Sequence, residues 1–102
     1  MAALKEEPNL KIHFAIVVLV LGLSYFLQIS RQDWVDIFLV IGFVFAIELT
    51  NTAIETVVDA FTDKSHPSAK LAKDISAGAV LVSATTASIV GILIFLPYLF
   101  NG

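Results

Sequence analysis

Three long apolar stretches dominate this chain of 102 residues. Residues 12–30 carry no formal charge when His13 is neutral, a second stretch spans residues 34–61, and a third is uncharged from residue 75 onward. A helix of about 20 apolar residues crosses the hydrocarbon core of a bilayer. Only 15% of the residues are charged, too few for the surface of a soluble domain of this size. The sequence therefore predicts an all-α integral membrane protein with three transmembrane helices.

The composition excludes several kinds of site. The chain has no cysteine, which excludes disulfides, thiol nucleophiles and cysteine-ligated metal centres. Its two histidines lie far apart in the sequence, so a histidine-rich metal site within one chain is not expected. The net charge of -3 provides no basic field, and we expect no nucleic-acid partner. Neither a Walker A motif nor a G-x-G-x-x-G motif is present.

The junctions between the apolar stretches are short and predict one domain over residues 1–102. Residues 31–33 form the first junction, and residues 62–67 form the second. Pro67 suits the first turn of the third helix, and we expect Pro97 to end that helix. A signal peptide is the alternative for the first stretch, but its flank is mixed in sign and no A-x-A site follows.

The basic residues predict the orientation in the membrane. Five of the six would lie on one side, and they are Lys5, Lys11, Lys64, Lys70 and Lys73. Arg31 alone lies in the first junction. The positive-inside rule then places the N-terminus and the second junction in the cytoplasm and the C-terminus outside. We expect a multi-pass protein of the bacterial cytoplasmic membrane.

Four polar side chains of the second stretch share one helical face, and they are Glu48, Asn51, Glu55 and Asp59. At about 100° per residue, all of them fall within about 60° of Glu48. With Trp34 at the outer boundary, Glu48 lies about 21 Å into a core about 30 Å thick. Glu48 is therefore predicted to lie in the hydrocarbon, with Glu55 and Asp59 at or beyond the headgroups.

A carboxylate in the hydrocarbon points to a function, because it costs on the order of 2.5 kcal/mol or more. The alternative is that Glu48 and Asn51 hydrogen-bond to neighbouring helices and only fix their packing. That alternative explains Asn51 well. It explains three acids on one face poorly, because like charges repel unless a cation lies between them.

Charged groups from separate segments would meet at the cytoplasmic surface, and they are Glu6, Glu7, Glu55, Lys70, Lys73 and Asp74. Carboxylates and a lysine in this arrangement can hold Mg²⁺ and nucleotide phosphates without a glycine-rich loop. A submerged carboxylate can act as a general base toward a lipid hydroxyl. Chemistry on a lipid headgroup is therefore reasonable, although the spacing alone names no reaction.

Two motifs support a more specific interpretation. Residues 48–59 read E-x-x-N-T-A-I-E-x-x-V-D, and residues 72–80 read A-K-D-x-x-A-x-A-V. Together they resemble the prokaryotic diacylglycerol kinase family, and the resemblance covers nearly the whole chain. Residues 6–13 are similar to the segment before the first membrane helix, in the form found in the undecaprenol kinases of Gram-positive bacteria.

The resemblance implies roles for individual residues. Glu48 matches the proposed general base, and Glu7 and Glu55 match two carboxylates that bind the divalent cation accompanying ATP. Lys73 matches a lysine that contacts the phosphates, with Asp74 beside it.

The resemblance also implies supporting roles in the same site. Asn51 matches an asparagine that helps to organise the site, and Asp59 either closes the polar face or pairs with Lys64. Lys64, Ser65 and His66 occupy the position that contacts the adenine end of the nucleotide. Family members are homotrimers with sites between subunits.

One departure from the family concerns the N-terminus. Family members have an amphipathic surface helix before the Glu-Glu-Pro segment, whereas only residues 1–5 precede it here. We therefore expect that helix to be missing or truncated in this chain, and it contributes to the nucleotide and lipid sites of the family.

The expected function is ATP- and Mg²⁺-dependent phosphorylation of a membrane lipid alcohol. Undecaprenol is the preferred substrate and diacylglycerol the alternative, both on resemblance. A small oligomeric proton-coupled transporter is the hypothesis from another class, with Glu48 as its relay carboxylate. A structural subunit without chemistry is the third hypothesis. A relay needs polar groups across the full depth of the membrane, and the outer half of each span is apolar.

Overall fold

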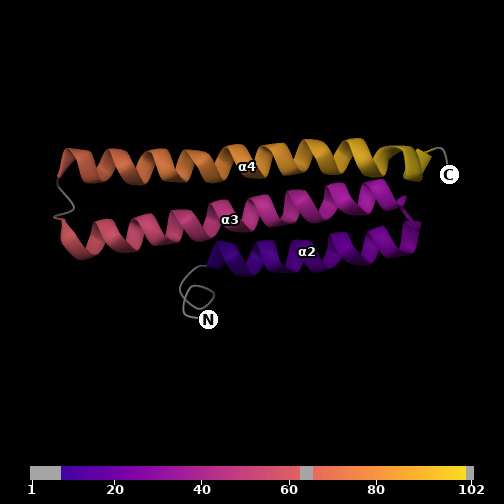
Figure 1. The fold of residues 1–102 in the computed structure, drawn as a ribbon, viewed down its shortest axis with the longest axis horizontal. Helices are drawn as coiled ribbons and strands as arrows, with labels where there is room; N and C mark the ends of the chain where they lie inside the picture. Colours follow the sequence, from indigo (N-terminus) through magenta and orange to yellow (C-terminus); the bar gives the residue numbers. More distant parts are fainter. Residues whose placement is uncertain (1–7, 63–65, 101–102) are drawn as a thin grey trace.

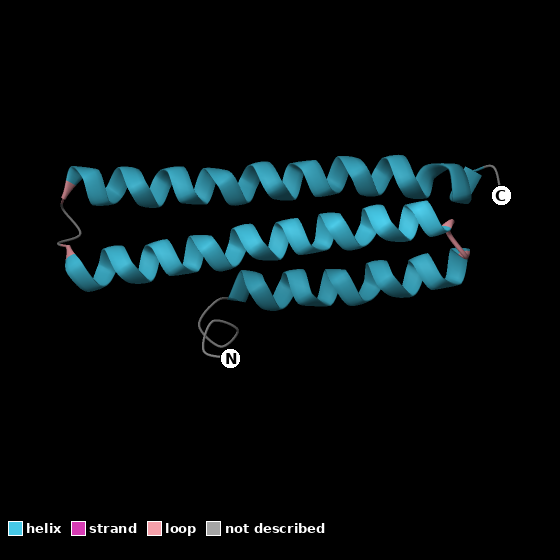
Figure 2. Ribbon diagram, in the orientation of Figure 1, coloured by secondary structure: helices cyan, strands magenta, loops and turns pink. Residues whose placement is uncertain are grey.

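A computed structural model of the chain describes residues 8–62 and 66–100, and these residues form three helices. Helix α2 covers Pro8–Leu27, α3 covers Arg31–Phe61 and α4 covers Pro67–Phe100. The described residues contain no strand (Figure 2), which confirms the all-helical prediction for this part of the chain. Residues 1–5, which stand where family members have a surface helix, lie outside the described residues.

The three helices form an elongated antiparallel arrangement in which α3 lies between α2 and α4 (Figure 1). The longest dimension is 55 Å, and α4 alone accounts for about 51 Å at 1.5 Å per residue. Helix α2 is shorter and begins beside the middle of α3. The last turns of α3 and the first turns of α4 therefore extend beyond the start of α2.

Helix α2 ends in a Schellman motif, which turns the chain sharply into α3. The Ile29 amide donates to the Ser24 carbonyl at 3.3 Å, and the Gln28 amide donates to the Tyr25 carbonyl at 3.2 Å. Gln28 adopts a φ of 52°, in the left-handed region that this motif requires. Ser30 then caps α3, because its side chain accepts a hydrogen bond from the backbone amide of Asp33.

The end of α4 packs against this turn through Tyr98. The Tyr98 hydroxyl accepts a hydrogen bond from the Ser30 amide at 2.9 Å and donates one to Asp33 Oδ2 at 2.5 Å. The expectation that Pro97 ends the helix is wrong, because α4 continues through it to Phe100. A proline this close to the C-terminus removes only one hydrogen bond of the last turn, and the contacts of Tyr98 hold that turn in place.

Small side chains let α4 lie close to α3 along most of its length. Ala69, Ser76 and Ser83 are buried and recur every seven residues, the spacing of a continuous helix–helix contact. Ser83 satisfies its hydroxyl by donating to the carbonyl of Val80 within its own helix. The α3–α4 pair is therefore the best-packed part of the molecule.

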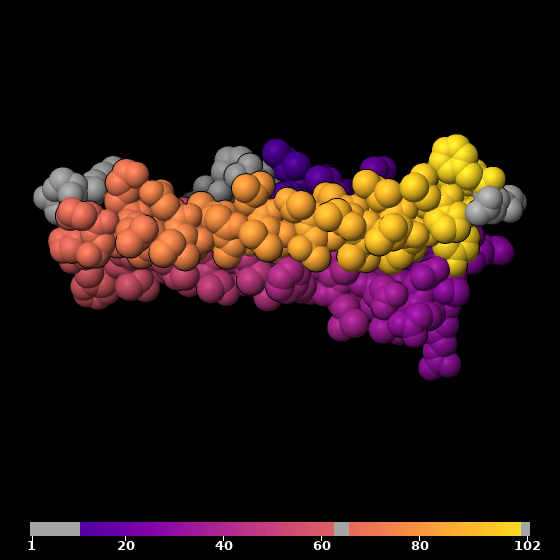
Figure 3. Space-filling model, turned by 90° about the horizontal axis from the view of Figure 1, so that it is seen from above, coloured from indigo at the N-terminus to yellow at the C-terminus, as the bar shows by residue number. Residues whose placement is uncertain are grey.

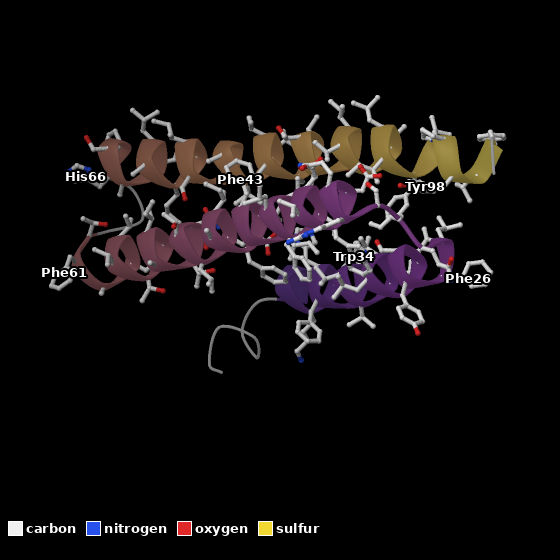
Figure 4. All side chains as sticks on the ribbon, turned by 45° about the vertical axis from the view of Figure 1, so that its right-hand side comes forward. Phe26, Trp34, Phe43, Phe61, His66 and Tyr98 are labelled. Atoms are coloured by element: carbon white, nitrogen blue, oxygen red, sulfur yellow. The ribbon has the colours of Figure 1, made fainter. Side chains whose placement is uncertain are left out.

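Most large apolar side chains remain exposed, and the buried apolar cluster consists of Ile29, Ile37 and Ile94 near the turn between α2 and α3. Phe26 and Phe61 project away from the helices (Figure 4). The molecule presents a rod-shaped surface with α4 lying along the face seen in Figure 3. Such a surface suits a lipid environment or further protein contacts rather than water.

Two of the helices are long and apolar enough to span a membrane, namely α3 and α4. The apolar part of α2 covers Lys11–Leu27 and is shorter. These properties agree with the prediction of a helical membrane protein, while the count of three spans stays a prediction.

Gln28, the turn residue with a positive φ, gives a test of the fold. Gln28→Gly is expected to stabilise the protein by about 0.5–1 kcal/mol, because glycine adopts a positive φ without a Cβ clash. The measurement is the midpoint of thermal unfolding of the purified protein in detergent micelles. Gln32→Gly, inside the first turn of α3, is the matched control and should lower the midpoint. A lower midpoint for Gln28→Gly would contradict the turn geometry.

Candidate active site

The central feature of the site is the buried carboxylate of Glu48. Its side chain lies within α3 and the residue is only 7% exposed. Glu48 Oε1 directly contacts Nδ1 of His13, which lies near the N-terminal end of α2. Glu48 is thus buried by neighbouring helices, while its predicted depth in the hydrocarbon stays a prediction. His13 makes the contact between α2 and α3.

Asn51 lies one turn further along α3 and faces α4. Its side-chain oxygen accepts a hydrogen bond of 2.6 Å from the hydroxyl of Ser76, which is buried on α4. Thr52 donates to the backbone carbonyl of Glu48 at 3.1 Å and so turns its hydroxyl back onto its own helix. Asn51 therefore holds the second half of α3 in register with α4, as an organising residue would.

The acids nearer the end of α3 lie beside a lysine of α4. Lys73 Nζ lies 2.9 Å from Asp59 Oδ1, in an ion pair that joins the two helices. Glu55, one turn before Asp59, is half-buried and contributes to the electrostatic field at Lys73. The structure thus brings Glu55, Asp59 and Lys73 together. Lys73 is the partner found for Asp59, and Lys64 lies outside the described residues.

The start of α4 carries two further predicted residues. Asp74 pairs with Lys70 of the same helix at 3.1 Å, on the exposed surface one turn from the Asp59–Lys73 pair. His66 caps α4, because its Nδ1 accepts a hydrogen bond from the Ser68 amide at 3.2 Å and its carbonyl accepts one from the Lys70 amide. His66 is therefore fixed at the helix end, near the cytoplasmic edge that the lysines predict.

The remaining predicted residues, Glu7, Lys64 and Ser65, lie outside the described residues. Within residues 8–62 and 66–100, no group of three or more histidine, aspartate or glutamate side chains could hold a metal ion. The described part of one chain therefore supplies Glu55 as a single candidate ligand rather than a complete metal site.

An apolar cavity of about 480 Å³ lies between the three helices. It extends from His13 near the N-terminal end of α2 to Phe95 and Leu99 near the C-terminal end of α4. Between these limits its walls are apolar residues of all three helices, together with Ser88. The cavity therefore offers a path for a hydrocarbon chain that leads to the His13–Glu48 pair.

Two contacts of the site were not predicted from the sequence. The pairing of His13 with Glu48 joins residues 35 positions apart, and only the presence of a polar side chain in each of two apolar stretches could have suggested it. The bond from Ser76 to Asn51 depends on how α3 and α4 align, which the sequence does not give.

Comparison with known proteins shows which family this chain resembles. The family model for prokaryotic diacylglycerol kinase matches residues 1–95. Undecaprenol kinase of Bacillus subtilis (strain 168) is 50% identical over 95 residues, which are 93% of this chain and 77% of that protein. No solved structure matches the chain significantly.

Two further relatives are both named diacylglycerol kinase. The protein of Synechocystis sp. is 38% identical over 100 residues, which are 97% of this chain and 57% of that protein. The protein of Pseudomonas aeruginosa is 28% identical over 89 residues, which are 87% of this chain and 72% of that protein. With a family model that covers residues 1–95 and a relative at 50% identity, this chain belongs to the prokaryotic diacylglycerol kinase family.

Proposed function

We propose that this chain transfers the γ-phosphoryl group of ATP to the hydroxyl of a membrane lipid alcohol, with undecaprenol as the preferred acceptor. Membership of a family of prokaryotic membrane kinases supports the reaction class. The relative named undecaprenol kinase is 50% identical and supports the choice of lipid. Diacylglycerol is the second candidate, because other relatives carry the name diacylglycerol kinase.

The observation that carries this proposal is the burial of Glu48 against His13, which lines one end of an apolar cavity. A buried carboxylate among apolar helices is costly and is rarely kept without a function. A lipid alcohol whose chain lies in the cavity would bring its hydroxyl to His13, next to the carboxylate that His13 contacts.

In the proposed reaction, Glu48 accepts the proton of the lipid hydroxyl. The oxygen of the lipid hydroxyl forms a bond to the γ-phosphorus, the bond from that phosphorus to the β–γ bridging oxygen breaks, and ADP departs. The hydroxyl proton passes to the Glu48 carboxylate as the new bond forms. Asn51 fixes the position of this turn of α3 through its bond to Ser76.

Lys73 is placed to meet the phosphates. It lies on the first turns of α4, where its ammonium group is held by Asp59 at 2.9 Å. A lysine so oriented can neutralise the negative charge that develops on the transferred phosphoryl group. We assign Asp59 to holding Lys73, and Asp74 with His66 to the neighbouring nucleotide surface, together with Lys64 and Ser65.

The residues present fit a magnesium ion that arrives with ATP. Mg²⁺ usually takes one or two protein carboxylates and completes its six ligands with phosphate oxygens and water. Glu55 is half-buried beside Lys73 and supplies one carboxylate, and we assign the second to Glu7. When bound, the ion would neutralise phosphate charge and orient the γ-phosphoryl group.

We further propose a homotrimer with three membrane spans in each chain and sites between subunits. The many exposed apolar side chains and the weak packing of α2 support additional protein contacts. The N-terminus and the site would face the cytoplasm and the C-terminus the outside, as the lysine distribution indicates. Family membership and the apolar lining of the outer cavity argue against the transporter hypothesis.

Glu48→Gln tests the assignment of the base. The amide cannot accept the lipid proton, so kcat is expected to fall by roughly 10²–10⁴-fold. Transfer of labelled phosphate from ATP to undecaprenol or diacylglycerol in mixed micelles measures this loss. Asp36→Asn, an acid-to-amide change at the outer end of α3, is the matched control and should retain activity. Lipid phosphorylation that survives Glu48→Gln would refute the assignment.

Glu55→Gln tests the metal assignment. Loss of one carboxylate ligand should raise the Mg²⁺ concentration for half-maximal activity by on the order of tenfold. The measurement is a magnesium titration of lipid phosphorylation at fixed ATP, with Asp36→Asn again as the control. An unchanged magnesium dependence in the variant would remove Glu55 from the metal site.

A pair of lysine variants tests the phosphate contact. Lys73 and Lys70 both lie on the first turns of α4 and both pair with an aspartate. Lys73→Gln should lower kcat/KM for ATP by on the order of tenfold or more, whereas Lys70→Gln should change it little. Because exposed ion pairs contribute little to stability, neither variant should lose much stability. Equal kinetic effects in the two variants would contradict the role of Lys73.

A further inference from the structure

We propose that His13 is a positioning residue for Glu48, holding the carboxylate in the orientation in which it accepts the lipid proton. This inference rests on the proposed function. It assigns a role in the reaction to a residue of α2 that would otherwise serve only helix packing. The observation behind it is the direct contact of His13 Nδ1 with Glu48 Oε1 inside the helical arrangement.

The contact joins two helices at a point where little else fixes them. At the outer end, the short turn through Gln28 and Ser30 connects α2 and α3 closely. The two helices share far less packing surface than α3 and α4 do. His13 lies near the opposite end of α2, so its contact with Glu48 fixes the inner end of α2 and the carboxylate together.

The contact also bears on which residue carries the hydrogen between the two side chains. One hydrogen must lie between Nδ1 and Oε1, because two lone pairs at hydrogen-bond distance repel each other. A base must be ionised to accept the lipid proton, so the proposal gives this hydrogen to His13, with Nδ1–H as the donor and Oε1 as the acceptor.

A purely structural role and a positioning role predict different behaviour. Any polar side chain that reaches Glu48 would satisfy a packing requirement. A positioning role needs a donor at the location of Nδ1. Asparagine places its side-chain amide near the position of Nδ1, whereas glutamine places it near that of Nε2. The two substitutions are both polar and neutral, so they separate the two roles.

The experiment compares His13→Asn, His13→Gln and His13→Leu with the wild-type chain in the micelle assay for lipid phosphorylation. The expected kcat of His13→Asn lies within about threefold of wild type, while His13→Gln and His13→Leu lose about tenfold or more. The KM for ATP should stay within about twofold in all three, because His13 acts on the base rather than on the nucleotide. Phe14→Leu, at the exposed neighbouring position, is the control and should leave kcat unchanged.

Equal kcat values in His13→Asn and His13→Gln would overturn the inference, and this comparison holds even if His13→Leu does not fold. A wild-type kcat in His13→Leu would overturn it as well. Both results would leave the proposed function intact as long as the wild-type chain phosphorylates a lipid. A wild-type chain that phosphorylates neither lipid alcohol would overturn the proposed function, and with it the base that His13 would position.

Discussion

A carboxylate in an apolar helix is the constraint on which the rest of the molecule depends. Glu48 sits where its charge loses the solvation of water, so the surrounding helices must compensate for it. His13 provides that compensation from α2, and the neighbouring turn of α3 is held to α4 through Asn51 and Ser76. The position of the acid thus determines which faces of three helices must meet.

From this point the site divides into an apolar and a polar half. Toward the turn between α2 and α3, the cavity between the helices is lined by apolar side chains and suits a hydrocarbon chain. At the other end, α3 and α4 extend beyond the start of α2 and carry Glu55, Asp59 and Lys73. A kinase that joins an apolar acceptor to a charged donor needs an apolar and a charged environment in one site, and this arrangement provides both.

Much of this could be predicted from the sequence, because helical periodicity fixes the angle of each residue on its own helix. The shared face from Glu48 to Asp59 follows from that rule, and the helices follow from the lengths of the apolar stretches. Periodicity does not say which neighbouring helix a face meets, so the partners of Glu48 and Asp59 emerged only from the structure. Pro97 was misjudged because a local rule for helix ends took no account of the distant contacts of Tyr98.

The central claim is that a lipid hydroxyl reaches Glu48 from the apolar cavity. An undecaprenol analogue with a photoreactive diazirine next to its hydroxyl tests this most directly, with the adducts located by mass spectrometry of the cross-linked chain. The account predicts an adduct on the segment containing Glu48, and excess unlabelled undecaprenol should suppress it. Adducts confined to outward-facing side chains such as Phe26, unchanged by the competitor, would contradict the account.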